Sequence, residues 1–300
     1  MWKVTDVPSL KDKIILITGG NSGIGLEAAK VFAEKEATLV IASSNKEKSD
    51  KAVKSLREET NNQNIDAYEL NLGSKASIKR FADAIKKAYD RIDILVNNSG
   101  VMYKPYERTE DGFESQMGIN HLGHFYLTSL LMTLIKKSEQ GRVVNIASVA
   151  HKFANASLKD FFFDNKKSFS PSKGYNRSKL TNLLFTLALA HKLKESNQSI
   201  EVFAAHPGIA DTSLTKHMKQ DFRLKMIKKI SHSAYAGGLP TVMAATTKDY
   251  PSGTYFGPVG FMEFKGEPGV AKKTKHAQDL ALALKVWNLS EEALGITFDL

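Results

Sequence analysis

The chain has 300 residues, of which 42% are hydrophobic and 25% charged, a composition typical of a folded globular protein. It contains no cysteine, which excludes disulfides, thiolate catalysis and cysteine-ligated zinc. The net charge of +10 is compatible with a surface that attracts anionic ligands. Because the lysines are spread along the chain and no aromatic stripe alternates with them, we expect no nucleic-acid partner.

The sequence shows no segment typical of a membrane anchor or a secretory signal. Residues 1–13 carry charges and Pro8 without an apolar run. The apolar run at residues 127–135 is interrupted by threonine and serine and is too short to span a bilayer. We therefore expect a cytoplasmic protein.

The first predicted strand and helix are joined by a glycine-rich turn. Residues 13–18 are apolar and β-branched, which predicts a buried parallel strand, and residues 26–33 have helical periodicity. In such a turn, glycines allow a tight bend, close approach of a pyrophosphate and packing of the helix on the strand. The turn predicts a dinucleotide phosphate site, with an ordinary glycine-rich connection as the alternative. Its residues are Gly19, Asn21, Ser22, Gly23, Ile24 and Gly25.

The second predicted strand, residues 38–43, ends where an adenosine ribose would bind. The residues there are Ser43, Ser44 and Asn45. An acidic residue at this point would select NAD, because its carboxylate accepts from the ribose hydroxyls. Since no acid is present, and Lys46 and Lys48 follow, a 2′-phosphate would be received rather than repelled. We expect NADP(H) to be preferred, with NAD(H) as the alternative.

Strands and helices continue to alternate along the chain. Residues 65–70 and 92–96 read as strands, and residues 47–60 and 75–89 read as helices. This alternation predicts a parallel, doubly wound α/β sheet. The strand at 92–96 leads into a polar turn at the sheet edge where ligands bind in such folds. The turn consists of Asn97, Asn98, Ser99 and Gly100.

A long apolar helix is predicted over residues 113–136. It carries Asn120, which is either a satisfied structural group or a residue that holds water and backbone near a site, because an unbonded buried amide is costly. His121 and His124 lack a third ligand at useful spacing, so we expect no metal.

A tyrosine and a lysine four residues apart follow the fifth predicted strand, which covers residues 141–148. On the helix predicted at 175–193, Tyr175 and Lys179 share one face. A free phenol titrates near ~10. A nearby ammonium would lower that pKa and make the phenol usable for proton transfer. The phenylalanines between Ser148 and Tyr175 belong either to the core or to a substrate pocket.

The last third of the chain contains Pro207 and Gly208 in a loop after the strand predicted at 200–205, followed by Ile209 and Thr212. Thr212 would cap a helix or contact a nicotinamide. Residues 213–232 form either a substrate lid or a solvated surface helix. We expect one domain over residues 1–300, with a C-terminal extension at 274–300.

Together these motifs resemble the short-chain dehydrogenase/reductase family. The shared features are Thr18 with Gly19, Gly23 and Gly25; the Asn97–Gly100 turn; Asn120; Ser148; Tyr175 and Lys179; and Pro207 with Gly208. The surroundings of Asn120 and Tyr175 resemble the retinol dehydrogenase-like branch. The tail around Tyr255 and Trp287 is similar to bacterial members of unassigned substrate.

The resemblance implies a Rossmann fold with about seven parallel strands and helices on both faces. It implies an NAD(P)-dependent oxidoreductase that interconverts a carbonyl and an alcohol on an apolar small molecule, in a chain that pairs with itself. Tyr175 would be the general acid or base, and Lys179 would bind the nicotinamide ribose. Ser148 would bind the substrate oxygen, and Asn120 would hold a relay water. A cofactor-binding regulator or scaffold on the same fold is the alternative.

Three positions depart from the family pattern. Ser99 stands where alanine is usual, and Asn71, beside Leu72 in the expected adenine site, stands where aspartate is usual. Ser44 stands where branch members tend to have arginine, which weakens the expectation of NADP.

Overall fold

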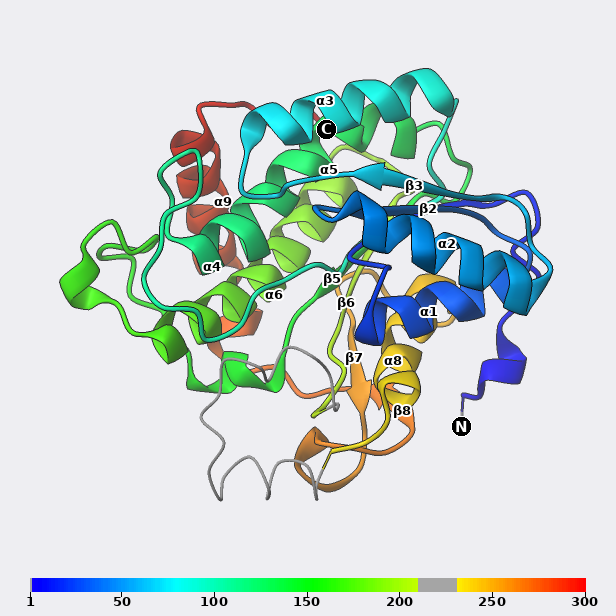
Figure 1. The fold of residues 1–300 in the computed structure, drawn as a ribbon. Helices are drawn as coiled ribbons and strands as arrows, with labels where there is room; N and C mark the ends of the chain where they lie inside the picture. Colours follow the sequence, from blue (N-terminus) through cyan, green and yellow to red (C-terminus); the bar gives the residue numbers. More distant parts are fainter. Residues whose placement is uncertain (1, 210–230) are drawn as a thin grey trace.

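The computed structural model describes residues 2–209 and 231–300, and its centre is one twisted sheet (Figure 1). Within these residues the strand order is β3-β2-β1-β4-β5-β6-β7-β8. The strands are β1 (Ile14–Thr18), β2 (Thr38–Ser43), β3 (Ile65–Glu69), β4 (Ile94–Asn97), β5 (Arg142–Ile146), β6 (Glu201–Ala205), β7 (Tyr255–Pro258) and β8 (Pro268–Val270). The first seven run parallel, which confirms the doubly wound fold.

The eighth strand was not predicted. It pairs antiparallel with β7 at the edge of the sheet and contains Pro268 and Gly269. Proline and glycine argue against a strand in sequence, because proline donates no ladder hydrogen bond and glycine packs no side chain. An edge position tolerates both, and only the pairing with β7 reveals the strand.

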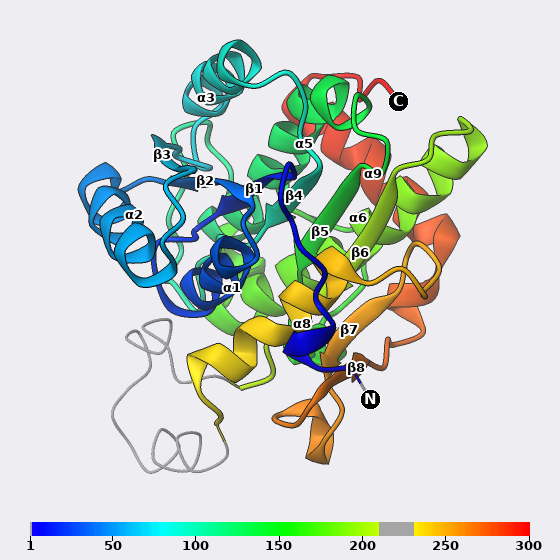
Figure 2. The ribbon, with the colours of Figure 1, turned by 90° about the vertical axis from the view of Figure 1, so that its right-hand side faces the viewer.

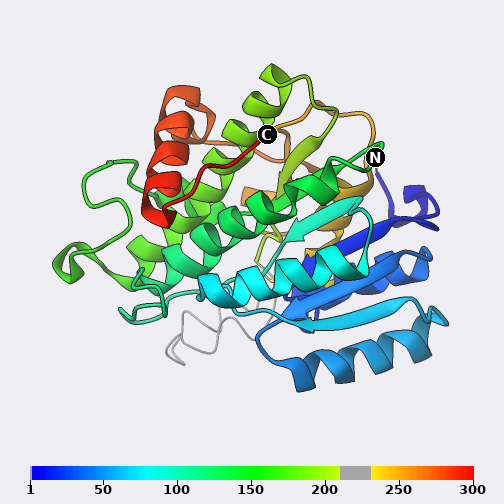
Figure 3. The same cartoon turned by 90° about the horizontal axis from the view of Figure 1, so that it is seen from above.

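The helices cover both faces of the sheet (Figures 2 and 3). One layer holds α1 (Gly23–Glu34), α2 (Lys46–Thr60) and α8 (Ala234–Thr246). The other holds α3 (Lys75–Ala88), α5 (Gly123–Ile135), α6 (Pro171–Glu195) and α9 (Leu280–Leu294). These helices pack on the sheet through an apolar face. In α3 this face consists of residues at helical spacing that are all buried: Ile78, Phe81, Ala82 and Ile85.

The predicted helix over residues 113–136 is interrupted in the structure. It consists of the short α4 (Ser115–Met117), a π-helical turn at Gly118–Leu122, and α5. Gly123 lies so close to the loop between β3 and α3 that an added Cβ would come within 2.3 Å of the Leu72 carbonyl oxygen. The wider π turn, a feature that often marks functional sites, carries Asn120.

The C-terminal helix α9 is attached through one large aromatic cluster. Trp287 is 2% exposed, and its ring lies 4.7 Å from that of Phe298 and 4.9 Å from that of Phe125. We expect Trp287→Ala to lower the free energy of unfolding by about 3–5 kcal/mol, because it opens a cavity that the helices cannot fill. Chemical denaturation measures this, with the 78% exposed Phe261→Ala as control. Equal stability of the two variants would contradict the anchoring role.

Candidate active site

A cleft of about 470 Å³ lies at the carboxyl edge of the sheet. Most of the predicted site residues line it: Gly19, Asn21, Ser22, Gly23, Ile24, Gly25, Ser43, Ser44, Asn45, Asn71, Leu72, Asn98, Ser99, Gly100, Tyr175, Lys179 and Pro207. Lys48, expected near a 2′-phosphate, also lines it, as do residues that the sequence did not indicate: Leu70, Val101, Ile119, Ile146 and Ala147. Asn120, Ser148, Gly208 and Ile209 are outside its lining. The structure thus brings the nucleotide motifs and the tyrosine–lysine pair to one place.

The glycine turn has a shape that only glycine permits. Gly19 and Gly23 have φ angles of +68° and +54°, in the region that side chains disfavour. A Cβ on Gly25 would come within 2.4 Å of the Gly19 carbonyl oxygen. Because the backbone is open toward the cleft at this turn and α1 begins at Gly23, its N–H groups suit a bound pyrophosphate. The residues present therefore fit a dinucleotide.

Thr18 joins this turn to the turn after β4. Its Oγ1 accepts hydrogen bonds from the backbone N–H groups of Asn98 and Ser99, both at 2.9 Å. In return, Asn98 Nδ2 donates to the Thr18 carbonyl oxygen at 2.8 Å. The Asn98 side chain therefore holds two loops of the cleft together.

Ser43, Ser44 and Asn45, which were predicted together to contact the ribose, have different environments in the structure. The Ser43 hydroxyl is buried and bonded to Asn21 and Ser49, and Asn45 Oδ1 accepts from Lys48 N at 2.8 Å to cap α2. Ser44 is exposed and lines the cleft. Its hydroxyl is therefore the one best placed among the three for a ligand.

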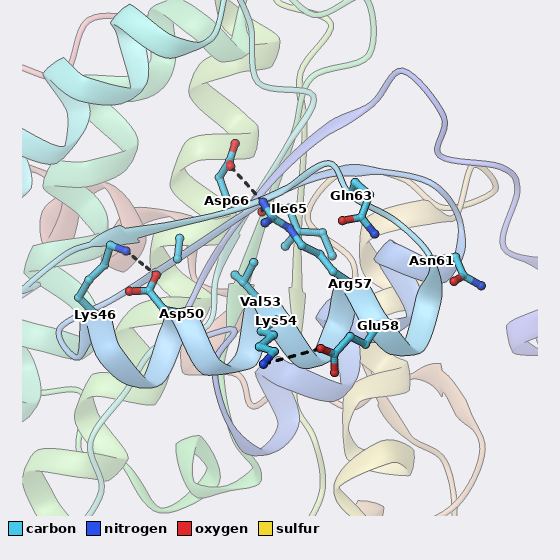
Figure 4. A pocket seen from close by; sticks show the side chains of 11 residues that line it. Lys46, Asp50, Val53, Lys54, Arg57, Glu58, Asn61, Gln63, Ile65 and Asp66 are labelled. Carbon is cyan, nitrogen blue, oxygen red and sulfur yellow. Dashed lines mark hydrogen bonds and ion pairs between the residues drawn. The ribbon is translucent and has the colours of Figure 1, made fainter.

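The two lysines that follow β2 lie in different environments, Lys48 in the cleft and Lys46 in a separate groove. Lys48 lines the cleft and has no ion pair among the described residues. Lys46 pairs with Asp50 in a separate surface groove of about 590 Å³ between α2 and β3 (Figure 4). The other charges in that groove also pair with each other, Lys54 with Glu58 and Arg57 with Asp66. Of the two lysines, Lys48 is therefore the one available to a ligand in the cleft.

Asn71, expected in the adenine site, is held within the protein. Its Oδ1 accepts from Gly73 N at 2.9 Å, and its Nδ2 donates to Glu110 Oε1 at 2.9 Å. An aspartate at this position could not donate to Glu110. The asparagine that replaces the family's usual aspartate is therefore explained by its hydrogen bond to the Glu110 carboxylate.

Asn120 is completely buried, and its side chain is a satisfied structural group. Its Nδ2 donates to Val101 O at 3.0 Å and to Ser178 Oγ at 2.9 Å, while its Oδ1 accepts from Val101 N at 2.8 Å. These bonds connect the loop after β4 with the helix that carries the tyrosine–lysine pair. Both amide protons of Asn120 are engaged in these bonds and are not free to hold a water. The relay water implied by the family resemblance stays a prediction.

The structure brings together Ser148, Tyr175 and Lys179, three of the residues predicted to be catalytic. Ser148 follows β5, and the other two lie on α6, which Ser170 caps and Pro171 begins one turn before Tyr175. Lys179 Nζ donates to Ile146 O at 3.0 Å and lies 5.8 Å from the centre of the Tyr175 ring. The phenol of Tyr175 and the ammonium of Lys179 therefore line the cleft together, and the Ser148 hydroxyl is bonded to that phenol.

Burial shifts the acidity of both groups on α6. It raises the pKa of Tyr175 to about 12, and the hydrogen bond with Ser148 opposes this. Burial lowers the pKa of Lys179 to about 8. The expectation that Lys179 brings the tyrosine pKa below that of a free phenol is therefore wrong for the folded chain by itself, because the loss of water raises this pKa more than the hydrogen bond with Ser148 lowers it.

The remaining predictions concern metals, membranes and the lid. In the described parts of the chain no three histidine, cysteine or acidic residues gather as a metal site. No helix in those parts is long and apolar enough to cross a bilayer. Thr212 and nearly all of the predicted lid at 213–232 lie outside the described residues.

Residues 13–161 match the family described as short chain dehydrogenase. The chain is 34% identical to retinol dehydrogenase 14 of Mus musculus over 95% of its own length and 86% of that protein's. An uncharacterised protein from Mycobacterium paratuberculosis superposes with a TM-score of 0.83 at 32% identity, covering 100% of this chain and 99% of that one. RhlG of Pseudomonas aeruginosa in complex with NADP gives 0.66 at 25% identity, covering 82% and 94%. The chain therefore belongs to the short-chain dehydrogenase/reductase family of oxidoreductases, within which it resembles the retinol dehydrogenases.

Proposed function

We propose that the protein interconverts a carbonyl and an alcohol on an apolar small molecule, with NADP(H) preferred over NAD(H). The observation that carries this proposal is that Tyr175, bonded to Ser148, and Lys179 line the same cleft as the glycine turn, whose backbone suits a bound pyrophosphate. A cofactor-binding regulator would not need a phenol, a hydroxyl and an ammonium together in its cleft.

The nicotinamide cofactor, when bound, supplies the hydride or receives it. Tyr175 would give a proton to the substrate oxygen in reduction and take it back in oxidation. Ser148 would donate a hydrogen bond to the same oxygen and stabilise the negative charge that develops there. Lys179 would place a positive charge beside the phenol, and its bond to Ile146 O fixes where that charge lies.

The relatives support the substrate class and the cofactor. The name retinol dehydrogenase 14 assigns that protein an apolar alcohol, and the RhlG structure holds NADP. In this chain, Ser44 and Lys48 would receive the 2′-phosphate, because one is an exposed hydroxyl and the other an ammonium that lines the cleft. Among the described residues that line the cleft, none is acidic, so none would repel this phosphate.

The proposal is tested by titrating the purified protein with NADPH and NADH and following nucleotide fluorescence. The tighter nucleotide is then used to assay apolar aldehydes, ketones and alcohols. We expect tighter binding of NADPH and turnover of apolar substrates. Binding without turnover of any of these would favour the regulator, and absence of binding would refute the proposal.

Ser44→Asp is expected to reverse the cofactor preference. The new carboxylate would repel a 2′-phosphate and accept from a plain ribose, so NADPH affinity should fall about tenfold or more relative to NADH. The same fluorescence titration measures it. Lys46→Ala is the control, because Lys46 pairs with Asp50 outside the cleft, whereas Lys48→Ala should weaken NADPH binding selectively. An unchanged preference in Ser44→Asp would place the ribose elsewhere.

A further inference from the structure

Three buried polar side chains form a cluster beside Ser148 that the proposed reaction does not use. They are His151 on the 3-10 helix Val149–Phe153, His206 just after β6, and Tyr255 at the start of β7. Their exposures are 1%, 0% and 1%. The Tyr255 ring contacts both imidazoles, with centres 5.6 Å from His151 and 5.0 Å from His206.

The hydrogen bonds of the two histidines assign their protons. His151 Nδ1 lies 2.7 Å from the Ser148 carbonyl oxygen, which only accepts, so Nδ1 carries the proton and Nε2 is a bare acceptor. His206 Nδ1 accepts from Gly208 N–H at 3.1 Å, so its Nε2 carries the proton. Burial lowers the pKa of His206 to about 3 and also lowers the pKa of His151. The cluster thus presents one donor, one acceptor and a phenol.

These three groups have no partner in the described structure. His151 Nε2, His206 Nε2 and the Tyr255 hydroxyl are buried, and none of them bonds to any described residue. The nearest carboxylate, that of Glu263, is 4.0 Å from His206 Nε2, too far for a hydrogen bond. Its oxygens are already bonded to Lys152 Nζ at 2.6 Å and Lys272 N at 2.7 Å. Buried polar groups are normally paired, so three in one place call for a ligand.

The neighbouring strand makes room for this arrangement. A Cβ on Gly257 would come within 1.9 Å of His206 Nε2, so the imidazole can lie there only beside a glycine. Gly257 of β7 therefore leaves the space that the His206 ring occupies.

We propose that His151 Nε2, His206 Nε2 and the Tyr255 hydroxyl together bind one neutral hydroxyl oxygen. A hydroxyl can accept from His206 and donate to His151 at the same time. An ionised carboxylate or phosphate has no proton to donate to His151. A metal cation would be repelled by the N–H proton of His206. The hydroxyl belongs either to an internal water or to a second alcohol group of the substrate.

The bound hydroxyl would connect two sides of the reaction centre. His151 holds the Ser148 backbone, and His206 holds Gly208 in the loop that begins with Pro207. A ligand bonded to both imidazoles would fix Ser148 relative to that loop. This consequence rests on the proposed function, whereas the binding itself does not.

Three substitutions remove the free polar atoms one at a time; the two at histidine keep the bond already made but also remove the ring that contacts Tyr255. Tyr255→Phe removes only the hydroxyl. His206→Asn can still accept from Gly208 N–H, and His151→Asn can still donate to the Ser148 carbonyl. If an internal water is bound, each change should lower the melting temperature of the free protein by about 2–4 °C, as expected for the loss of one hydrogen bond. Tyr235→Phe is the control, because Tyr235 is 43% exposed.

A shared ligand also predicts that the losses are not additive. Tyr255→Phe combined with His206→Asn should cost less than the sum of the two, because the first change already releases the ligand. If the hydroxyl comes from the substrate, the single variants should melt like the wild type. In that case 1,6-hexanediol should raise the melting temperature of the wild type more than 1-hexanol does. The single variants should lose this difference between the two alcohols.

Two results would overturn the inference. In the first, Tyr255→Phe is as stable as the wild type or more stable, as removal of an unsatisfied hydroxyl predicts, and the diol has no advantage to lose. In the second, the losses are fully additive, which means that each atom has a separate partner. Melting requires no turnover, so these outcomes are independent of whether the oxidoreductase assignment fails.

Discussion

Tyr175→Phe is expected to lower kcat/KM for carbonyl reduction by about 10²–10⁴-fold, the range for loss of a general acid. Phenylalanine keeps the ring and its edge contact with Tyr103, whose centre is 5.2 Å away. Only the hydroxyl and its hydrogen bond with Ser148 are lost. Nucleotide affinity and melting temperature should therefore change little. Steady-state kinetics with the preferred nucleotide measure the effect.

Tyr103→Phe is the matched control for this experiment. Its phenol lies next to that of Tyr175 but is given no role in proton transfer, so we expect its removal to change kcat/KM by less than about tenfold. Wild-type turnover by Tyr175→Phe would refute the assigned chemistry. Equal losses in both variants would show that the effect comes from the packing of the two rings.

Lys179→Met is expected to abolish most activity and to weaken nucleotide binding by about 10–100-fold, as loss of a charged hydrogen-bond donor predicts. Lys179 is 4% exposed, and burial lowers its pKa to about 8. In the wild type, nucleotide affinity should fall as the pH rises through about 8, because Lys179 then loses its charge. Fluorescence titrations between about pH 6.5 and 9.5 test this, and the slope should be absent in Lys179→Met.

The same substitution should make the free protein more stable near neutral pH. The pKa of Lys179 is about 8 in the folded chain, below its ordinary value of 10.5. Between these values the unfolded chain binds more protons, so the stability due to this group rises with pH and is lowest below about 8. Lys179→Met removes that cost, and its advantage in melting temperature should shrink toward pH 10.5. Lower stability at every pH would mean that Lys179 is mainly structural.

Several features of the fold and of the candidate site follow from local sequence. The β-branched run before Gly19 predicts β1, because a strand buried on both faces must be apolar throughout. The φ angles of Gly19 and Gly23 explain why glycine is needed at the turn. The spacing of Tyr175 and Lys179 is a property of one helix. Parallel strands bring such motifs to one sheet edge without further information, so the composition of the cleft was largely predictable.

Other features depend on contacts between distant segments. Lys46 and Lys48 look equivalent in sequence, yet Asp50 takes the first and leaves the second to the cleft. The edge strand β8 exists only through pairing with β7.

Acidity also follows from tertiary structure. The expected effect of Lys179 on Tyr175 used only their spacing, but Lys179 is buried and Tyr175 partly buried in the cleft, and removal from water dominates the pKa of each. The cluster of His151, His206 and Tyr255 has the same origin, because a 3-10 helix and two strands meet there. The sequence by itself therefore determined which groups share a local element, whereas only tertiary structure decided which of them are buried, paired or left for a ligand.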